Sequence, residues 1–210
     1  MQIIGITGGI GSGKSTIARA LAARGFAVYD CDKEAKRIIA ENAEVQQKII
    51  NLFGEKSFVN GVYNTPYISK CVFSPSLQGR SGEALLAQLN AIIHPAVKED
   101  ICQQALPAVY RAKPVLFIES AILYEAELDS LCDKIIVVEA PEDIRIARTI
   151  ARDYHGDASP ENINKVRARI RAQEAVCLPP GQACIRHQMV VQNDGKRSID
   201  ELVADILQNL

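Results

Sequence analysis

The chain has 210 residues, of which 48% are hydrophobic and 23% are charged, and its formal net charge is −1. This length suits one well-buried domain, and the composition excludes a disordered or fibrous protein. Near-neutral charge argues against mainly electrostatic binding to nucleic acid, and no apolar run approaches the roughly 20 residues of a membrane span. Since the start of the chain does not have the pattern of a secretory signal, we expect a cytoplasmic protein.

The six cysteines are spread along the chain without a C-x-x-C pair, which predicts reduced thiols in that compartment. Cys177, Cys184 and His187 are the one group that might form a metal site. Their spacing matches no usual zinc pattern and a fourth ligand is missing, so we do not expect one.

The first elements along the chain predict a strand, a glycine loop and a helix. Residues 2–7 form a β-branched run that ends in glycines, and residues 15–24 are alanine-rich with helical periodicity. Gly25 stands where a glycine often ends a helix, and a second apolar run, residues 26–29, leads into Asp30-Cys31-Asp32. A strand-helix-strand unit is therefore complete by residue 32.

The middle third reads as mostly helical. Residues 33–53 have a helical pattern, residues 54–64 are a turn-rich connection, and loop-prone residues continue to about residue 82. We expect residues 83–93 to form a helix that His94-Pro95 interrupts, with a further helix to about residue 105. No part of this region predicts a strand.

Three further strands are expected at residues 115–118, 134–138 and 189–191. Continuous apolar runs flanked by helices are typical of strands buried on both faces of a parallel sheet. An arginine-rich helix follows Pro141, and Ser198 is placed to cap the C-terminal helix. The pattern thus predicts an α/β fold with a five-stranded parallel sheet.

Residues 8–15, GGIGSGKS, satisfy G-x-x-x-x-G-K-[ST] between a predicted strand and a predicted helix. Glycines let successive backbone N–H groups converge on phosphates, and the helix N-terminus adds partial positive charge. Lys14 can follow the β- and γ-phosphates, while the Ser15 hydroxyl can bind Mg²⁺. The residues expected to bind the nucleotide here are Gly9, Ile10, Gly11, Ser12, Gly13, Lys14, Ser15 and Thr16.

The rest of the chain favours a small-molecule kinase over other nucleotide-binding proteins. A GTPase would need N-K-x-D, whereas residues 164–167 read NKVR and lie in a helical region. A transport or motor ATPase would need a signature segment and more chain. A nucleoside-monophosphate kinase and a nucleotide-switched binding protein stay open as alternatives.

The motifs resemble those of the dephospho-CoA kinases over nearly the whole chain. The shared segments are the opening GITGGIGSGKST, VYDCD after the second strand, Ile93-His94-Pro95, residues 122–125, Arg148, Arg152-Asp153, residues 169–173 and Asn193-Asp194-Gly195. Some positions depart from the family pattern, namely Ser120-Ala121, Arg145, His187-Gln188 and Thr65-Pro66-Tyr67. None of these departures lies within the glycine-loop sequence.

The resemblance implies transfer of the γ-phosphoryl of ATP, with Mg²⁺, to the 3′-hydroxyl of dephospho-CoA. It implies a three-layer P-loop NTPase fold in one domain, 1–210, with a helical acceptor-binding insertion and a helical lid. The expected core is about 1–32, 106–143 and 176–210, the insertion about 33–105, and the lid about 144–175. We expect dephospho-CoA as the partner, neither nucleic acid nor membrane, and a monomer or weak homo-oligomer.

Asp32 is the candidate to orient or deprotonate the acceptor hydroxyl, because it follows a strand beside the glycine loop. The alternative is that Asp32 caps the helix beginning near Lys33, and Asp30 could share either role. His94 is expected to contact the acceptor by resemblance, although a structural histidine is the alternative.

Arg145, Arg148 and Arg152 recur at i, i+3 and i+7 and so share one helix face. The resemblance favours phosphate binding by Arg148 or Arg152 over a solvated basic stripe, with Arg148 in a catalytic role. For Arg167 and Arg171, pairing with carboxylates is the alternative to phosphate binding. The lid is expected to close on ATP.

Glu119 and Glu125 are equal candidates to assist Mg²⁺, in the manner of an acidic residue that ends a strand beside the glycine loop. The segment from Asn193 to Gly195 is expected to contact the adenine, with a plain β-turn as the alternative.

Overall fold

The computed structural model describes residues 2–73, 81–107, 114–176 and 188–210. The chain divides into two compact units. The first comprises Met1–Asp30 and Pro107–Leu210, and the second comprises Cys31–Leu106.

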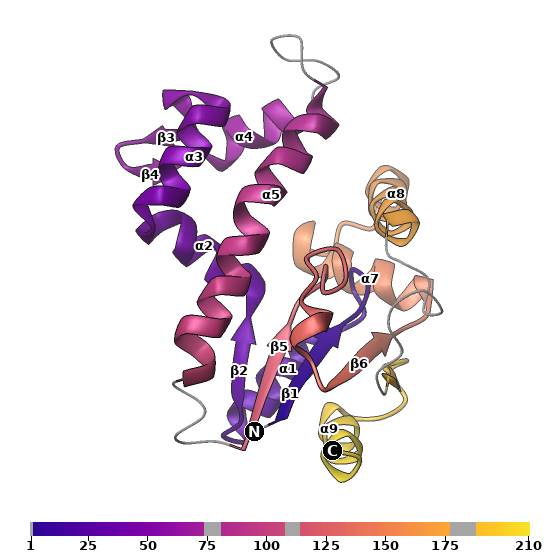
Figure 1. Cartoon of the computed structure of the whole chain (residues 1–210). Helices are drawn as coiled ribbons and strands as arrows, with labels where there is room; N and C mark the ends of the chain where they lie inside the picture. Colours follow the sequence, from indigo (N-terminus) through magenta and orange to yellow (C-terminus); the bar gives the residue numbers. More distant parts are fainter. Residues whose placement is uncertain (1, 74–80, 108–113, 177–187) are drawn as a thin grey trace. The chain divides into compact units, whose positions relative to one another are not determined.

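A five-stranded parallel sheet forms the centre of the first unit (Figure 1). Its order is β2-β5-β1-β6-β7. The strands are β1 (Gln2–Thr7), β2 (Ala27–Asp30), β5 (Val115–Glu119), β6 (Lys134–Glu139) and β7 (Gln188–Gln192). All five strands predicted from the sequence are confirmed to within one or two residues, because each is a short apolar run with turn residues at its ends.

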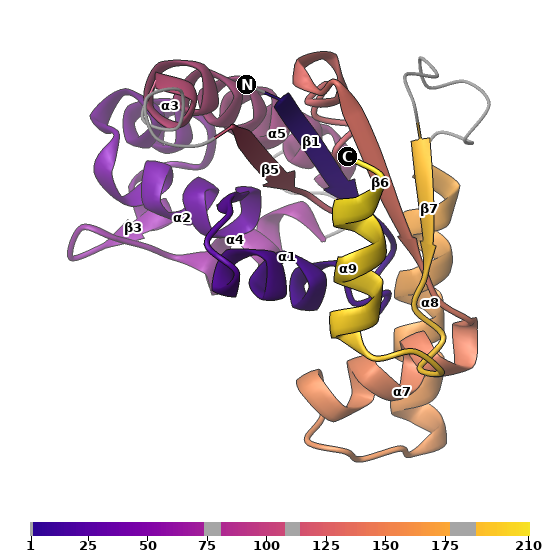
Figure 2. The same ribbon diagram turned by 90° about the horizontal axis from the view of Figure 1, so that it is seen from below.

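Helices α1 (Lys14–Ala23) and α9 (Ile199–Gln208) lie side by side along this sheet (Figure 2). Their apolar faces join the strand side chains in one core cluster, which includes Ile6, Ile17 and Leu202. The predicted cap of α9 is confirmed as a full capping box, in which Ser198 and Glu201 each bond the other's backbone N–H. Gly25 has φ 88°, as expected for a glycine after a helix.

Two more helices belong to the first unit, α7 (Glu142–Asp153) and α8 (Pro160–Val176). They pack on each other through Ile146, Ile150, Val166 and Ile170, with the side chain of Ile10 added from the glycine loop. The arginine-rich helix predicted after Pro141 is therefore confirmed as α7. Short 3-10 turns also occur, as η3 (Asp129–Leu131) in this unit and η1 (Glu55–Ser57) in the second.

The second unit is mainly helical. Its helices are α2 (Cys31–Glu41), α3 (Ala43–Phe53), α4 (Thr65–Val72) and α5 (Gly82–Asp100), followed by the π-helical turn η2 (Ile101–Ala105). A partly buried ion pair joins α2 to α5, where Arg37 donates to both carboxylate oxygens of Asp100 at 2.7 and 2.8 Å. The interval predicted as one helical region, 33–53, is divided where Asn42 caps α3.

Three expectations for the second unit were wrong. A hairpin, β3 (Phe58–Val59) with β4 (Val62–Tyr63), occurs where no strand was expected. Its turn places Asn60 and Gly61 at positive φ, 52° and 76°, which suits this dipeptide. Helix α4 replaces an expected loop, and Asn64 caps it by accepting from Tyr67 N–H at 3.3 Å.

The third wrong expectation concerns Pro95, which does not interrupt α5. An interior proline removes one helical hydrogen bond and costs about 3 kcal/mol. Buried side chains on both sides of it, Leu89 before and Val97 after, hold the helix together.

Within the described ranges no helix is both long and apolar enough to span a membrane. The described residues also hold no cluster of three metal-ligating side chains. The cysteines at 31, 71, 102 and 132 are free thiols. The group of Cys177, Cys184 and His187 lies outside the described residues.

Candidate active site

The carboxyl ends of the strands bring the site residues of the first unit together. Asp30 lies opposite Glu119 in the pairing of β2 with β5, and Glu119 also lies opposite Ile6 of β1. The glycine loop begins directly after β1, so it starts at the same edge of the sheet. Ligands of open α/β sheets bind at this edge.

The glycine loop has a backbone that side chains could not follow. Gly11 and Gly13 have φ 77° and 94°, and a Cβ on Gly11 would lie 2.4 Å from the carbonyl oxygen of Arg145. No side chain caps the first turn of α1, which leaves its N–H groups to a ligand. The loop therefore fits a phosphate chain, as its sequence predicts.

Lys14 and Ser15 meet on one buried carboxylate. Lys14 Nζ lies 3.7 Å from Glu119 Oε1, and the Ser15 hydroxyl donates to the same oxygen at 3.2 Å. Glu119 is only 4% exposed. A hydroxyl beside a carboxylate is a donor set that suits Mg²⁺, which prefers oxygen ligands. Glu125 instead lines a neighbouring cavity, so the geometry separates two candidates that the sequence did not.

Arg148 and Asn193 lie together on the glycine loop. Arg148 donates to the Ser12 carbonyl at 3.2 Å and to Asn193 Oδ1 at 3.1 Å, while Asn193 Nδ2 donates to Ser12 O at 2.8 Å. Asn193 is 3% exposed, and Gly195 turns the chain at φ 81°. Two residues expected to bind the nucleotide are therefore neighbours, although 45 positions separate them in the chain.

Arg152 lies apart from this group. It is exposed and pairs with Asp153, which also accepts from Arg169 at 2.9 Å. These hydrogen bonds hold the pKa of Asp153 down at about 2, so the carboxylate stays charged at neutral pH. Arg167 likewise pairs with Glu142 at 3.1 Å, which agrees with the carboxylate pairing expected as one of its two roles. A nucleotide contact by Arg152 stays a prediction.

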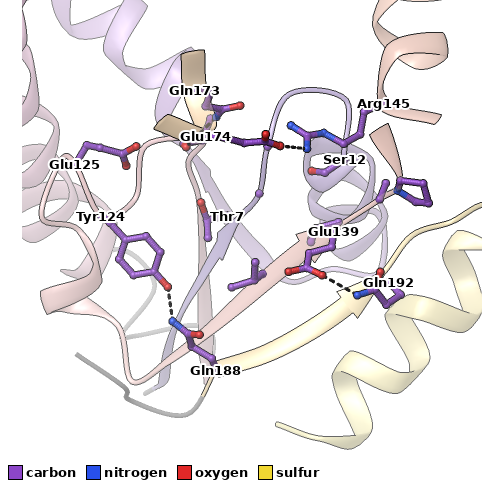
Figure 3. A pocket seen from close by; sticks show the side chains of 17 residues that line it. Thr7, Ser12, Tyr124, Glu125, Glu139, Arg145, Gln173, Glu174, Gln188 and Gln192 are labelled. Atoms are coloured by element: carbon purple, nitrogen blue, oxygen red, sulfur yellow. Dashed lines mark hydrogen bonds and ion pairs between the residues drawn. The ribbon is translucent and has the colours of Figure 1, made fainter. Parts of the chain in front are cut away.

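The tip of the glycine loop is held by α7 and α8, an arrangement that could not be predicted from the sequence. Ile10 N–H donates to Gln173 Oε1 at 2.7 Å, and Arg145 Nε donates to Ile10 O at 2.9 Å. Arg145 is fixed in turn by Glu174 at 2.5 Å (Figure 3). With its side chain in the cluster of α7 and α8, Ile10 is bound through its N–H, its carbonyl and its side chain.

We therefore expect Gln173→Leu to weaken ATP binding without unfolding the protein. Losing a partner for a partly buried N–H costs about 1–2 kcal/mol, which corresponds to a rise of roughly 5- to 30-fold in the KM for ATP. Steady-state kinetics with ATP varied and a thermal melt would measure both effects. Asn164→Leu, the same amide-to-leucine change on an exposed part of α8, is the matched control. An unchanged KM for ATP in Gln173→Leu would show that the contact does not position the loop.

Asp32 and His94 belong to the second unit. Asp32 is exposed in the first turn of α2, which begins at Cys31, so the expected alternative of a cap for a helix starting near Lys33 was wrong. His94 is partly buried within α5. The acceptor roles of both residues stay predictions.

Comparisons with known proteins show the family of the chain. The family model described as dephospho-CoA kinase matches residues 2–198. The chain belongs to the dephospho-CoA kinase family. A dephospho-CoA kinase from Porphyromonas gingivalis is 43% identical over 153 residues, 73% of this chain and 71% of that protein. One from Bacteroides fragilis is 34% identical over 211 residues, 99% of this chain and 94% of that protein.

Solved structures with the same fold are also found. TT1252 from Thermus thermophilus superposes with a TM-score of 0.72 at 30% identity, covering 100% of this chain and 97% of that one. A dephospho-CoA kinase from Campylobacter jejuni has a TM-score of 0.65 at 21% identity, with the same coverage, which shows the shared fold. The expected P-loop fold with a five-stranded parallel sheet is thereby confirmed. The family match and the curated relatives confirm the expected ATP-dependent kinase.

Proposed function

We propose that this chain transfers the γ-phosphoryl of ATP to the 3′-hydroxyl of dephospho-CoA, giving CoA and ADP. The observation that carries the proposal is the arrangement of Lys14 and Ser15 on the buried carboxylate of Glu119, in a glycine loop of this family. Phosphoryl transfer needs little covalent help from a protein, so positioning and charge neutralisation supply the catalysis. Neither a nucleoside-monophosphate kinase nor a nucleotide switch is proposed, because the family match covers most of the chain.

Each residue of the first unit has a distinct task in this proposal. Lys14 neutralises charge on the β- and γ-phosphates, and Arg148, which lies on α7 and donates to the Ser12 carbonyl of the loop, assists it. Ser15 and Glu119 would hold Mg²⁺, which would supply neutralising charge for the phosphate oxygens. Asp32 orients the acceptor hydroxyl and takes its proton. The expected lid closure of 144–175, the role of 33–105 in acceptor binding, the oligomeric state and the cellular location stay predictions.

An acceptor panel tests the proposed reaction. Release of ADP from Mg·ATP would be followed with dephospho-CoA, AMP, CMP, GMP and adenosine offered separately. We expect fast release with dephospho-CoA alone. Release with a nucleoside monophosphate instead would keep the role of Lys14 but overturn the acceptor, and slow release independent of any acceptor would favour a nucleotide switch.

The Mg²⁺ assignment predicts a specific defect in Glu119→Gln. Without the negative charge the site binds a divalent cation more weakly, so half-saturation should need about tenfold more Mg²⁺, and kcat should fall roughly 10²-fold. A titration of activity with Mg²⁺ at saturating ATP measures both. Glu125→Gln is the control, because Glu125 lines the neighbouring cavity. If Glu125→Gln shifted the Mg²⁺ titration and Glu119→Gln did not, the assignment would be reversed.

A further inference from the structure

A cavity of about 670 Å³ lies beside the glycine loop, at the carboxyl ends of β1 and β6 and along β7 (Figure 3). Thr7, Gly8, Gly9 and Ser12 form its wall toward the loop. Tyr124 and Glu125 from the segment after β5 form the opposite wall, and Gln188 and Gln192 enter from β7. This volume lies within the range of small-molecule sites, roughly 300–1,000 Å³.

The charges around the cavity disfavour a phosphate. Among the described residues, its lining includes three carboxylates, Glu125, Glu139 and Glu174, and one guanidinium, Arg145. Arg145 is already paired with Glu174 at 2.5 Å. A phosphate entering here would approach an excess of negative charge, and like charges brought together out of water repel strongly. The cavity therefore suits an uncharged ligand or part of one.

The neutral groups of the lining suit a chain that alternates amides with hydrocarbon. Gln188 Nε2 donates to the Tyr124 hydroxyl at 2.7 Å, and Gln192 Nε2 donates to Glu139 at 2.7 Å. Burial raises the pKa of the Tyr124 phenol, which keeps it a neutral hydrogen-bonding group. Apolar surface lies between these groups, from Ala121, Val137, Val138, Ala140 and Pro141.

Two polar atoms at the loop end of the cavity lack a hydrogen-bond partner among the described residues. They are Ser12 Oγ and Arg145 Nη2, and both are buried. A buried polar group without a partner is unfavourable and calls for an explanation such as a ligand. A carbonyl or hydroxyl oxygen of a neutral ligand is the kind of acceptor that each of these groups lacks.

We propose that this cavity binds the pantetheine arm of the acceptor. Pantetheine is uncharged and carries two amides, a hydroxyl and a dimethyl group along a flexible chain that ends in a thiol, so its polar and apolar parts match the lining. The proposal rests on dephospho-CoA being the acceptor. It adds that Tyr124, Gln188 and the Val137 side chain determine specificity for an acceptor with this arm.

Two substitutions test the site by different means. Val137→Phe places a larger side chain in the cavity, and Gln188→Leu removes an amide while keeping a similar size. Gln208→Leu, the same change on an exposed position of α9, is the matched control. The measurements are the KM for dephospho-CoA at saturating ATP, the KM for ATP, and inhibition by free pantetheine with dephospho-CoA varied.

In the unchanged protein we expect pantetheine to compete with dephospho-CoA. Val137→Phe and Gln188→Leu should each raise the KM for dephospho-CoA and the pantetheine inhibition constant about tenfold, with the KM for ATP within roughly twofold of normal. Absence of competition between pantetheine and dephospho-CoA would overturn the proposed site. So would a KM for dephospho-CoA and a pantetheine inhibition constant that stay unchanged both in Gln188→Leu and in a folded Val137→Phe. If Val137→Phe does not fold, Gln188→Leu alone decides.

Failure of the proposed function would give a different result from failure of the cavity proposal. The unchanged protein would then release no ADP with dephospho-CoA, whatever its response to pantetheine. A calorimetric titration of pantetheine into the unchanged protein and into Gln188→Leu would still decide the cavity, since the pantetheine site predicts binding that the substitution weakens. No heat of binding in the unchanged protein would reject it.

Discussion

Replacing Lys14 by alanine should lower kcat/KM for phosphoryl transfer by at least about 10³-fold, because a charge placed at the transferring phosphoryl is worth that much in rate. The Lys14 ammonium lies at the start of α1, 3.7 Å from Glu119, where it can reach the β- and γ-phosphates. Its loss also leaves the buried Glu119 carboxylate without that ion pair. Coupled kinetics with ATP varied, together with a thermal melt, would separate the catalytic defect from any loss of stability.

Lys48→Ala is the matched control for this substitution. Lys48 is exposed and pairs with Glu44, an i,i+4 neighbour on α3, and such surface pairs contribute little to stability. Activity of Lys48→Ala should match that of the unchanged protein. A Lys14→Ala protein that kept more than about a tenth of normal turnover would contradict the assigned role of the glycine loop in the chemistry.

The second large effect is expected for Asp32→Asn, which should lower kcat by about 10²- to 10⁴-fold while changing ATP affinity little. An amide cannot take the proton of the acceptor hydroxyl, although it fills the same space. Asp32 is exposed at the start of α2, so the substitution should leave the melting temperature unchanged. Single-turnover kinetics and an ATP binding titration would measure the two quantities separately.

Asp30→Asn is the informative comparison, since Asp30 lies two residues earlier and at the end of β2, opposite Glu119 in the sheet. If the defect in kcat appeared in Asp30→Asn and not in Asp32→Asn, the role of the base would pass to Asp30. Near-normal turnover in both variants would reject an aspartate at either position as the group that orients the hydroxyl.

The glycine loop and the five strands could be predicted because their signals are local. An apolar run beside turn residues fixes a strand, and glycines with Lys14 and Ser15 fix the phosphate loop. The hairpin turn and the start of α4 also have local signals, which are the Asn60-Gly61 dipeptide and the capping residue Asn64. The helix break expected at Pro95 was wrong, because packing on both sides of this residue keeps α5 intact.

The contacts that join distant parts of the chain could not be read from the sequence. Arg145 reaches Ile10 across 135 positions, and its spacing with Arg148 and Arg152 indicated only a shared helix face. Glu119 and Glu125 were equal candidates to assist Mg²⁺, because both lie near the end of a predicted strand. Side-chain placement separates them, because Glu119 is the final residue of β5 and lies next to β1, from which the glycine loop begins.

The most direct test of the central claim is the position of the transferred phosphoryl group. The protein would be incubated with dephospho-CoA and ATP labelled in the γ-phosphoryl, and the product would be analysed by ³¹P NMR and mass spectrometry. We predict that the label is found in CoA, as a phosphomonoester on the ribose 3′-oxygen. Label recovered only as inorganic phosphate would contradict the account, as would label on another acceptor atom.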